Sequence, residues 1–104
     1  MADTVKKKKT GGSVKVKVKY KEPSLYDVIM HNDDVTTMDF VVEILMDIFD
    51  KNNADAVTLM MKIHKEGMAR VARYSFDIAE TKRQEALIRA RAASFPLKIT
   101  LDRV

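Results

Sequence analysis

The chain has 104 residues, enough for one small domain with a modest core, and 46% of them are hydrophobic. It contains no cysteine, which excludes disulfides and thiolate metal sites, and it has no apolar run long enough to span a membrane. The lysine-rich N-terminus is not followed by an apolar segment, so it does not have the pattern of a secretory signal. We therefore expect a cytoplasmic protein.

The formal net charge of +4 is unevenly distributed along the chain. Residues 1–22 contain eight lysines and two acids, an excess of six positive charges, whereas residues 23–104 contain eleven basic and thirteen acidic residues. The alternation in "VKVKVKYK" (residues 14–21) is compatible with an edge strand, but a short, densely like-charged segment favours disorder. We expect a flexible extension that engages a partner; a solubilising tail and a nucleic-acid-binding arm are the alternatives.

The predicted elements begin after Pro23. "SLYDVIM" (residues 24–30) is rich in β-prone residues and ends at an Asn-Asp-Asp turn, which predicts a strand. "TTMD" has the pattern of a capping box, in which Thr36 caps a helix whose first turn contains Asp39. Up to about residue 50, where "DKNN" breaks the pattern, apolar residues recur at helical spacing: Met38, Val41, Val42, Leu45, Ile48 and Phe49.

A second and a third helix are predicted in the rest of the chain. The second runs from about residue 54 to residue 66, with Gly67 as its C-terminal stop. "MARVARY" (residues 68–74) then has the imperfect alternation of a strand. Ser75 is positioned to cap the third helix, which Pro96 ends. Alanines form the small-residue face of this helix: Ala79, Ala86, Ala90 and Ala93.

The last predicted element is a strand over residues 97–102, "LKITLD", which alternates strictly and places its three aliphatic residues on one face. The element order is therefore β-α-α-β-α-β. It predicts the α+β fold class, in which a three-stranded antiparallel sheet packs against helices in a single domain. We expect two parts of the chain: a flexible basic extension over residues 1–22 and a folded domain over residues 23–104.

Polar acceptors and apolar residues are predicted to gather beside the Asn-Asp-Asp turn. Met60, Ile63 and His64 share one face of the second helix by their spacing, and Met38 and Val41 share one face of the first. A pocket lined by these residues would be apolar, and it would be adaptable because methionine repacks around varied shapes. Hydrogen-bond acceptors would stand at its mouth: Asn32, Asp33, Asp34 and His64. Such a site suits a cation joined to a large apolar group, as in an α-ammonium group beside a Phe, Leu, Tyr or Trp side chain.

Each of these residues also has a purely structural interpretation. The apolar residues have the spacing of plain core, Asn-Asp-Asp is common turn and cap chemistry, and a single histidine on an apolar helix face is usually structural. The pattern of His31, His64, Asp33 and Asp34 matches no metal motif, so we expect no metal and no other cofactor. The chain also lacks a Ser-His-Asp order, a phosphate-binding glycine loop and a cysteine nucleophile, so we do not expect an enzyme.

Four segments, in register with one another, resemble the ClpS family of adaptors, which deliver N-degron substrates to the Clp protease: "NDDVTTMDFVVEIL", "LMMKIHKEG", "DIAETK" and "FPLKITL". The resemblance covers about Pro23 to Val104 and implies an α/β domain with the element order given above. It also implies a substrate-binding set for the α-amino group and the first side chain: Asn32, Asp33, Asp34, Thr36, Met38, Val41, Met60, Ile63, His64 and Leu97. In this set Met38 resembles the family's gate against β-branched first residues.

The resemblance implies a protein partner as well. The family contacts the N-terminal domain of a Clp AAA+ ATPase, ClpA-like or ClpC-like, through a stretch that matches Asp77, Glu80, Thr81 and Lys82. Residues 1–22 are similar to the family's extension, which enters the ATPase. We expect a monomer that binds neither nucleic acid nor membranes. Two alternatives come from other classes: a generic protein-interaction domain with the architecture of the ribosomal stalk protein's C-terminal domain, and a nucleic-acid binder that uses the basic tail.

Overall fold

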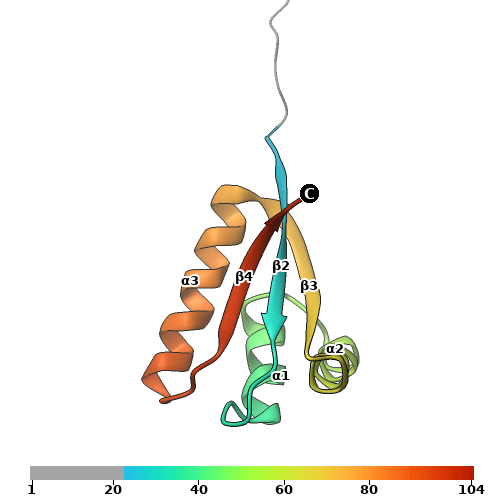
Figure 1. Cartoon of the computed structure of the whole chain (residues 1–104), viewed down its shortest axis with the longest axis vertical. Coiled ribbons are helices and arrows are strands. Elements are labelled where there is room, and N and C mark those ends of the chain that lie inside the picture. The colour runs from blue at the N-terminus through green and yellow to red at the C-terminus, as the bar shows by residue number, and fades with distance from the viewer. Residues whose placement is uncertain (1–22) are drawn as a thin grey trace, which may run out of the picture.

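Three strands and three helices follow one another in the order β-α-α-β-α-β in the computed structural model, which describes residues 23–104 (Figure 1). The bounds are β2 Leu25–His31, α1 Met38–Asp47, α2 Asn53–Glu66, β3 Met68–Ser75, α3 Phe76–Ala92 and β4 Lys98–Arg103. The predicted element order and fold class are therefore confirmed. The prediction for residues 1–22, a strand or a disordered extension, lies outside the described residues. Within residues 23–104, no helix has both the length and the apolar composition needed to cross a bilayer.

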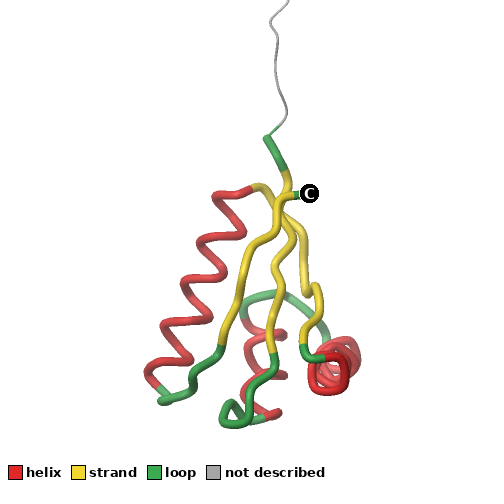
Figure 2. Tube along the Cα trace, in the orientation of Figure 1, coloured by secondary structure: helices red, strands yellow, loops and turns green. Residues whose placement is uncertain are grey.

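The sheet has the strand order β3-β2-β4, so β2 is central and pairs antiparallel with both neighbours. α3 runs alongside β4, and α2 lies beside the end of β3 at which that strand begins (Figure 2). Val28 and Met30 of β2 are fully buried, whereas the alternate residues Asp27 and Ile29 are only partly buried. This alternation gives the sheet a core face and an outer face.

A β-bulge explains the imperfect alternation of β3. Val28 pairs with Ala72, but the next residue, Ile29, pairs with Arg70, which leaves Val71 as the extra residue. The inward-facing positions of β3 therefore change parity at Val71. Beyond the bulge the pairing is regular as far as the start of β3, so the end of β2 stays in register with the turn that leads out of α2.

The N-cap of α1 is Thr37, so the predicted cap at Thr36 is wrong. The Thr37 hydroxyl accepts a hydrogen bond from the backbone N–H of Phe40, with N···O 3.2 Å. The Thr36 hydroxyl instead donates to the Asp33 carboxylate at 2.7 Å, which takes it away from the helix end. The prediction of Asp39 in the first helical turn is confirmed.

Two other helix ends differ from the sequence-based expectation. α1 ends at Asp47 rather than near residue 50, because Asp50 takes a positive φ of 58° and the chain turns toward α2. Ala93 is exposed at the C-cap of α3 and is not part of its buried face, since the helix is already ending there. The other three alanines of the predicted face, Ala79, Ala86 and Ala90, are fully buried.

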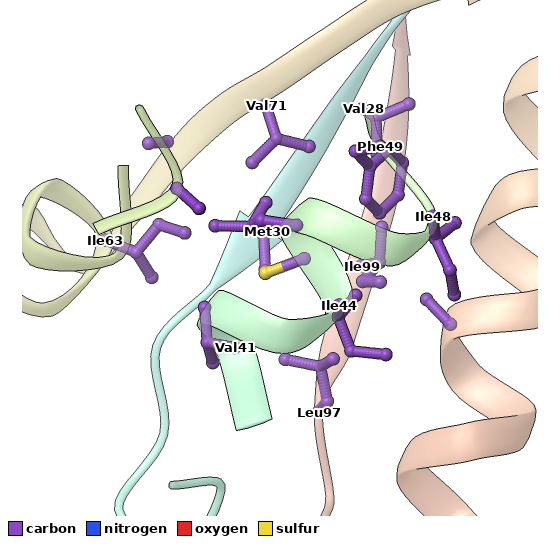
Figure 3. Packing of buried hydrophobic residues seen from close by; sticks show 14 of the residues in the cluster. Val28, Met30, Val41, Ile44, Ile48, Phe49, Ile63, Val71, Leu97 and Ile99 are labelled. Carbon is purple, nitrogen blue, oxygen red and sulfur yellow. The ribbon is translucent and has the colours of Figure 1, made fainter. Parts of the chain in front are cut away.

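The core lies between the inner face of the sheet and the helices, and Met30 stands near its centre (Figure 3). The largest fully buried side chains are Met30, Ile44, Leu45, Leu97, Ile99 and Val28. Two arginines of α3 fasten that helix to the segment containing β4: Arg83 Nε donates to the Ile99 carbonyl at 2.8 Å, and Arg91 Nη1 donates to the Leu97 carbonyl at 3.1 Å. Packing and these bonds together hold Leu97 under the end of the sheet where β2 finishes.

Candidate functional site

The end of β2 and the end of α2 are joined by one backbone hydrogen bond. The N–H of Asn32 donates to the carbonyl of Gly67 at 2.8 Å. Gly67 is the C-cap of α2 and has a φ of 90°, a left-handed conformation that glycine adopts without a steric penalty. Because His64 lies in the last turn of α2, this bond places the Asn-Asp-Asp turn next to the helix end that carries His64.

Asp33 uses both of its carboxylate oxygens within the turn. Oδ1 accepts from the N–H of Val35 at 2.8 Å and from the N–H of Thr36 at 2.7 Å, and Oδ2 accepts from the Thr36 hydroxyl at 2.7 Å. Partial burial raises the pKa of this carboxyl, but the hydrogen bonds from Thr36 and Val35 outweigh it and hold the pKa below its ordinary value. The structural interpretation of the turn therefore applies to Asp33 and Thr36, which shape the loop between β2 and α1.

The other three polar residues of the predicted mouth are exposed: Asn32, Asp34 and His64. An amide oxygen, a carboxylate and a neutral imidazole all accept hydrogen bonds, so these side chains can accept hydrogen bonds from a cation at this end of the sheet. His31 is separate from them and makes a 2.9 Å contact with the Thr100 hydroxyl. In residues 23–104, no group of three or more His, Asp or Glu side chains is arranged to hold a metal ion.

The apolar residues of the predicted pocket differ in their exposure. Three of them belong to the buried core and are 8%, 3% and 1% exposed, in this order: Val41, Ile63 and Leu97. Figure 3 shows these three side chains around Met30. Met38, the first residue of α1, is 43% exposed, and Met60 is partly buried against the core. Of the five predicted lining residues, the two methionines are therefore the more accessible ones.

Sequence reasoning missed two contributors to this site. One is Met30, which is fully buried among Val41, Ile63 and Leu97; the alternation within residues 24–30 was the signal that places it on the inner face of the sheet. The other is the carbonyl of Gly67, which accepts from Asn32. No local pattern indicates that second partner, because the two residues are 35 positions apart in the chain.

The stretch predicted to contact a partner lies on α3, near its N-terminus. Asp77 and Thr81 are exposed there. Glu80 forms an ion pair with Arg83 at 3.1 Å, and Lys82 Nζ donates to the carbonyl of Ile48 at 2.7 Å. The four residues share one helix, but Glu80 and Lys82 also have contacts within the chain. Since Ser75, at the start of α3, pairs with Leu25, this surface lies at the end of β2 opposite to Asn32.

Substitution of Asp33 tests its role in the turn. We expect Asp33→Ala to lower the free energy of unfolding by about 1–2 kcal/mol, because three hydrogen bonds to the turn are lost. The matched control is Asp34→Ala, at the exposed neighbouring carboxylate, which should change it by less than about 0.5 kcal/mol. Urea unfolding followed by circular dichroism measures both.

The lowered pKa of Asp33 also predicts that the stability difference between the natural chain and Asp33→Ala depends on pH. The folded pKa of Asp33 is lowered, so its stabilising contribution is present above the unfolded pKa of about 3.9 and is lost as the pH falls through the folded pKa. The stability difference between the natural chain and Asp33→Ala should therefore shrink below about pH 4. A difference that stays constant well below pH 4 would show that the carboxylate charge is not its source.

Comparison with known proteins gives the family of the chain. Residues 21–100 match the family described as ATP-dependent Clp protease adaptor protein ClpS. The chain belongs to the ClpS family. Among ClpS relatives, the ATP-dependent Clp protease adapter protein ClpS of Clostridium acetobutylicum is 44% identical over 92 residues, which cover 88% of this chain and 91% of the relative. ClpS of Treponema denticola is 44% identical over 100 residues, covering 96% of this chain and 98% of the relative.

A solved ClpS structure also has the same fold. Agrobacterium tumefaciens ClpS2 bound to L-phenylalaninamide is similar with a TM-score of 0.77 and 37% sequence identity. The similarity covers 80% of this chain and 100% of that chain. The resemblance seen in the four sequence segments is thereby confirmed, and the chain is a ClpS adaptor of the Clp protease.

Proposed function

We propose that this adaptor binds the free α-amino group and the large apolar first side chain of N-degron substrates and delivers them to a Clp AAA+ ATPase. One observation carries the proposal: the backbone hydrogen bond from Asn32 to Gly67 joins the ends of β2 and α2, two segments that carry the exposed acceptors Asn32 and His64. Met38 is accessible at the start of α1. The similar ClpS2 of Agrobacterium tumefaciens was solved with L-phenylalaninamide, which joins an amino group to an aromatic side chain.

The expected affinity follows from three contributions. Burying a Phe-sized side chain removes roughly 150 Å² of apolar surface from water and contributes about 4 kcal/mol. Each hydrogen bond to the ammonium contributes about 1.5–3 kcal/mol. Loss of translational and rotational freedom costs about 4 kcal/mol or more. With three such bonds, the balance is about 4.5–9 kcal/mol, and the upper end corresponds to a dissociation constant of about 1 μM or somewhat below. Such an affinity lets an adaptor hold its cargo and also release it.

Titration of labelled peptides that differ only in their first residue tests this function. We expect peptides that begin with Leu, Phe, Tyr or Trp to bind, and those that begin with Ile or Val to bind at least about tenfold more weakly. The reason is that a β-branched first residue places a methyl group against Met38 near the entrance. Equal affinity for Leu and Ile would show that Met38 is no gate. Equal affinity for Leu and Ser would overturn the proposed function itself.

His64→Ala should weaken binding of the Leu-started peptide by about 1–3 kcal/mol, because one acceptor for the ammonium is removed. His64 is exposed, so its removal should leave the fold intact. Lys65→Ala, at the exposed residue next to it in the last turn of α2, is the matched control and should bind normally. Fluorescence anisotropy measures both variants, and an unchanged affinity for His64→Ala would leave this histidine without a role in binding.

The remaining parts of the proposal concern partner and place. We infer that Asp77, Thr81 and the neighbouring α3 residues Glu80 and Lys82 contact the N-terminal domain of a ClpA-like or ClpC-like ATPase. The exposure of Asp77 and Thr81 supports this assignment. Residues 23–104 form the adaptor domain, and residues 1–22 act as the extension used in delivery. In this proposal the protein works as a cytoplasmic monomer.

A further inference from the structure

A surface cavity of about 390 Å³ lies between α3 and the C-terminal end of α1. Its lining residues are Ile48, Glu85, Ile88 and Arg89. Ile88 is 66% exposed, although isoleucine is a residue that proteins usually bury. Ile48 beneath it is buried, so the cavity presents aliphatic surface that continues into the core. An apolar side chain of moderate size, bound in the cavity, would cover Ile88 and remove it from water.

α1 gives one side of this cavity an acidic border. The helix carries three acidic residues at i, i+4 and i+8, Asp39, Glu43 and Asp47, and no basic residue. Arg89 of the cavity lining pairs with two of them, with Nη2 2.9 Å from a Glu43 oxygen and Nη1 3.2 Å from an Asp47 oxygen. One guanidinium thus serves two carboxylates, and the border keeps a negative excess.

On α3 and the residues after α1, two carboxylates again accompany one cation. Lys82 Nζ lies 3.5 Å from an Asp50 oxygen and donates to the carbonyl of Ile48, which lines the cavity. Glu85 is part of the lining itself. Among the lining residues and the ion pairs just named, four carboxylates (Glu43, Asp47, Asp50 and Glu85) therefore stand against two cations. Arg91, three residues after Ile88, donates to the carbonyls of Phe95 and Leu97. The ligand that complements this surface is an aliphatic segment with positive charges on both sides.

We propose that the cavity binds the chain's own residues 14–21, "VKVKVKYK". This segment alternates valine with lysine, so every apolar side chain has a cation beside it. The valine side chains can pack against the aliphatic side chains of Ile48 and Ile88. The lysine side chains are long enough for their ammonium groups to reach the carboxylates of the border. Residues 1–22 carry an excess of six positive charges, opposite in sign to the border.

The chain between the domain and this segment has the required length. Pro23 lines a cavity together with Phe76 and Asp77, so the described chain begins beside the N-terminus of α3. Ile88 is twelve residues after Phe76, about 18 Å along the helix axis. Residues 14–18 precede Pro23 by five to nine residues, and an extended chain of that length spans roughly 16–30 Å. The tether also gives the segment a high effective concentration at the cavity.

This contact goes beyond recognition of N-degrons and does not depend on it. Thr81, Glu85 and Ile88 follow one another at i, i+4 and i+7 on α3, so the bound segment would lie next to the surface proposed for the ATPase. Binding of the ATPase and release of the extension would then be coupled, since both involve the same face of α3.

A spin label on the extension of the full-length chain tests the contact. The chain has no cysteine, so Ser13→Cys provides one labelling site directly before the segment and leaves its valines unchanged. The isoleucine methyl groups are observed by NMR. At low salt, the methyl signals of Ile48 and Ile88 should be at least about twofold weaker with the paramagnetic label than after the label has been reduced. Ile29, on the outer face of the sheet, should keep its intensity. In about 1 M salt the loss should disappear, because screening removes the attraction.

Two substitutions at exposed isoleucines of α3 provide the controls. Ile88→Glu should restore the Ile48 signal, because it removes the aliphatic contact and adds a carboxylate at an exposed position. Ile78→Glu changes a residue that is 49% exposed and does not line the cavity, so the loss at Ile48 should persist.

Three results would overturn the proposal. Equal broadening of Ile29 and Ile48 would mean that the extension has no preferred site. Broadening of Ile48 that survives Ile88→Glu would place the contact elsewhere. In a mixture of spin-labelled chains with separate isotope-labelled chains, broadening of Ile88 would show that a second copy, and not the chain's own segment, fills the cavity.

Discussion

Acetylating the α-amino group of a Leu-started peptide should abolish its binding to this ClpS adaptor, with at least about a hundredfold loss of affinity. Acetylation removes the positive charge and two N–H donors, so Asn32, Asp34 and His64 lose the cation that they are proposed to accept from. Each lost charge-assisted bond is worth about 1.5–3 kcal/mol, and loss of two of them accounts for the expected change. Competition against a labelled Leu-started peptide measures the effect.

The control for this experiment keeps the acetyl group but moves it. A peptide acetylated only on a lysine side chain far from its first residue should bind like the unmodified peptide. If the N-terminally acetylated peptide also binds normally, the site recognises only apolar surface. The exposed acceptors between β2 and α2 would then have no part in ligand binding.

Deleting residues 1–20 should abolish stimulated degradation of a Leu-started or Phe-started reporter while peptide affinity stays nearly unchanged. The proposed ligand contacts all follow Pro23, whereas the excess of lysine precedes it. A segment without a core of its own can enter a pore that excludes a folded domain, and pulling on it can force the cargo across. Degradation by the ATPase–peptidase complex is compared for full-length and truncated adaptor at matched reporter occupancy.

Binding to the ATPase separates the possible causes of such a loss. The truncated adaptor should keep part of its affinity for the ATPase through the Asp77–Lys82 surface, whereas Asp77→Lys in the full-length chain should reduce that affinity. If the truncated form delivers the reporter as well as the full-length chain does, the extension is only a solubilising tail and the handover proposal is wrong.

Local patterns in the sequence were enough to predict the order of the elements. Periods of two and 3.6 residues identified the strands and helices, and Gly67 marked the end of α2 at the residue where the structure has it. These signals are local, because alternation, helical spacing and helix-ending residues act over a few positions of the chain. The same local spacing placed Met60, Ile63 and His64 on one face of the second helix.

Contacts between distant segments determine which of these residues remain exposed. The bulge at Val71, the hydrogen bond from Asn32 to Gly67 and the bond from Lys82 to Ile48 join segments that no local pattern connects. Packing selects one such set of contacts because each buried polar group must find a partner wherever the fold brings one. Asp33 shows the limit even at short range: its oxygens have several donors within reach, and it bonds Val35 and Thr36, which leaves Thr37 to cap α1.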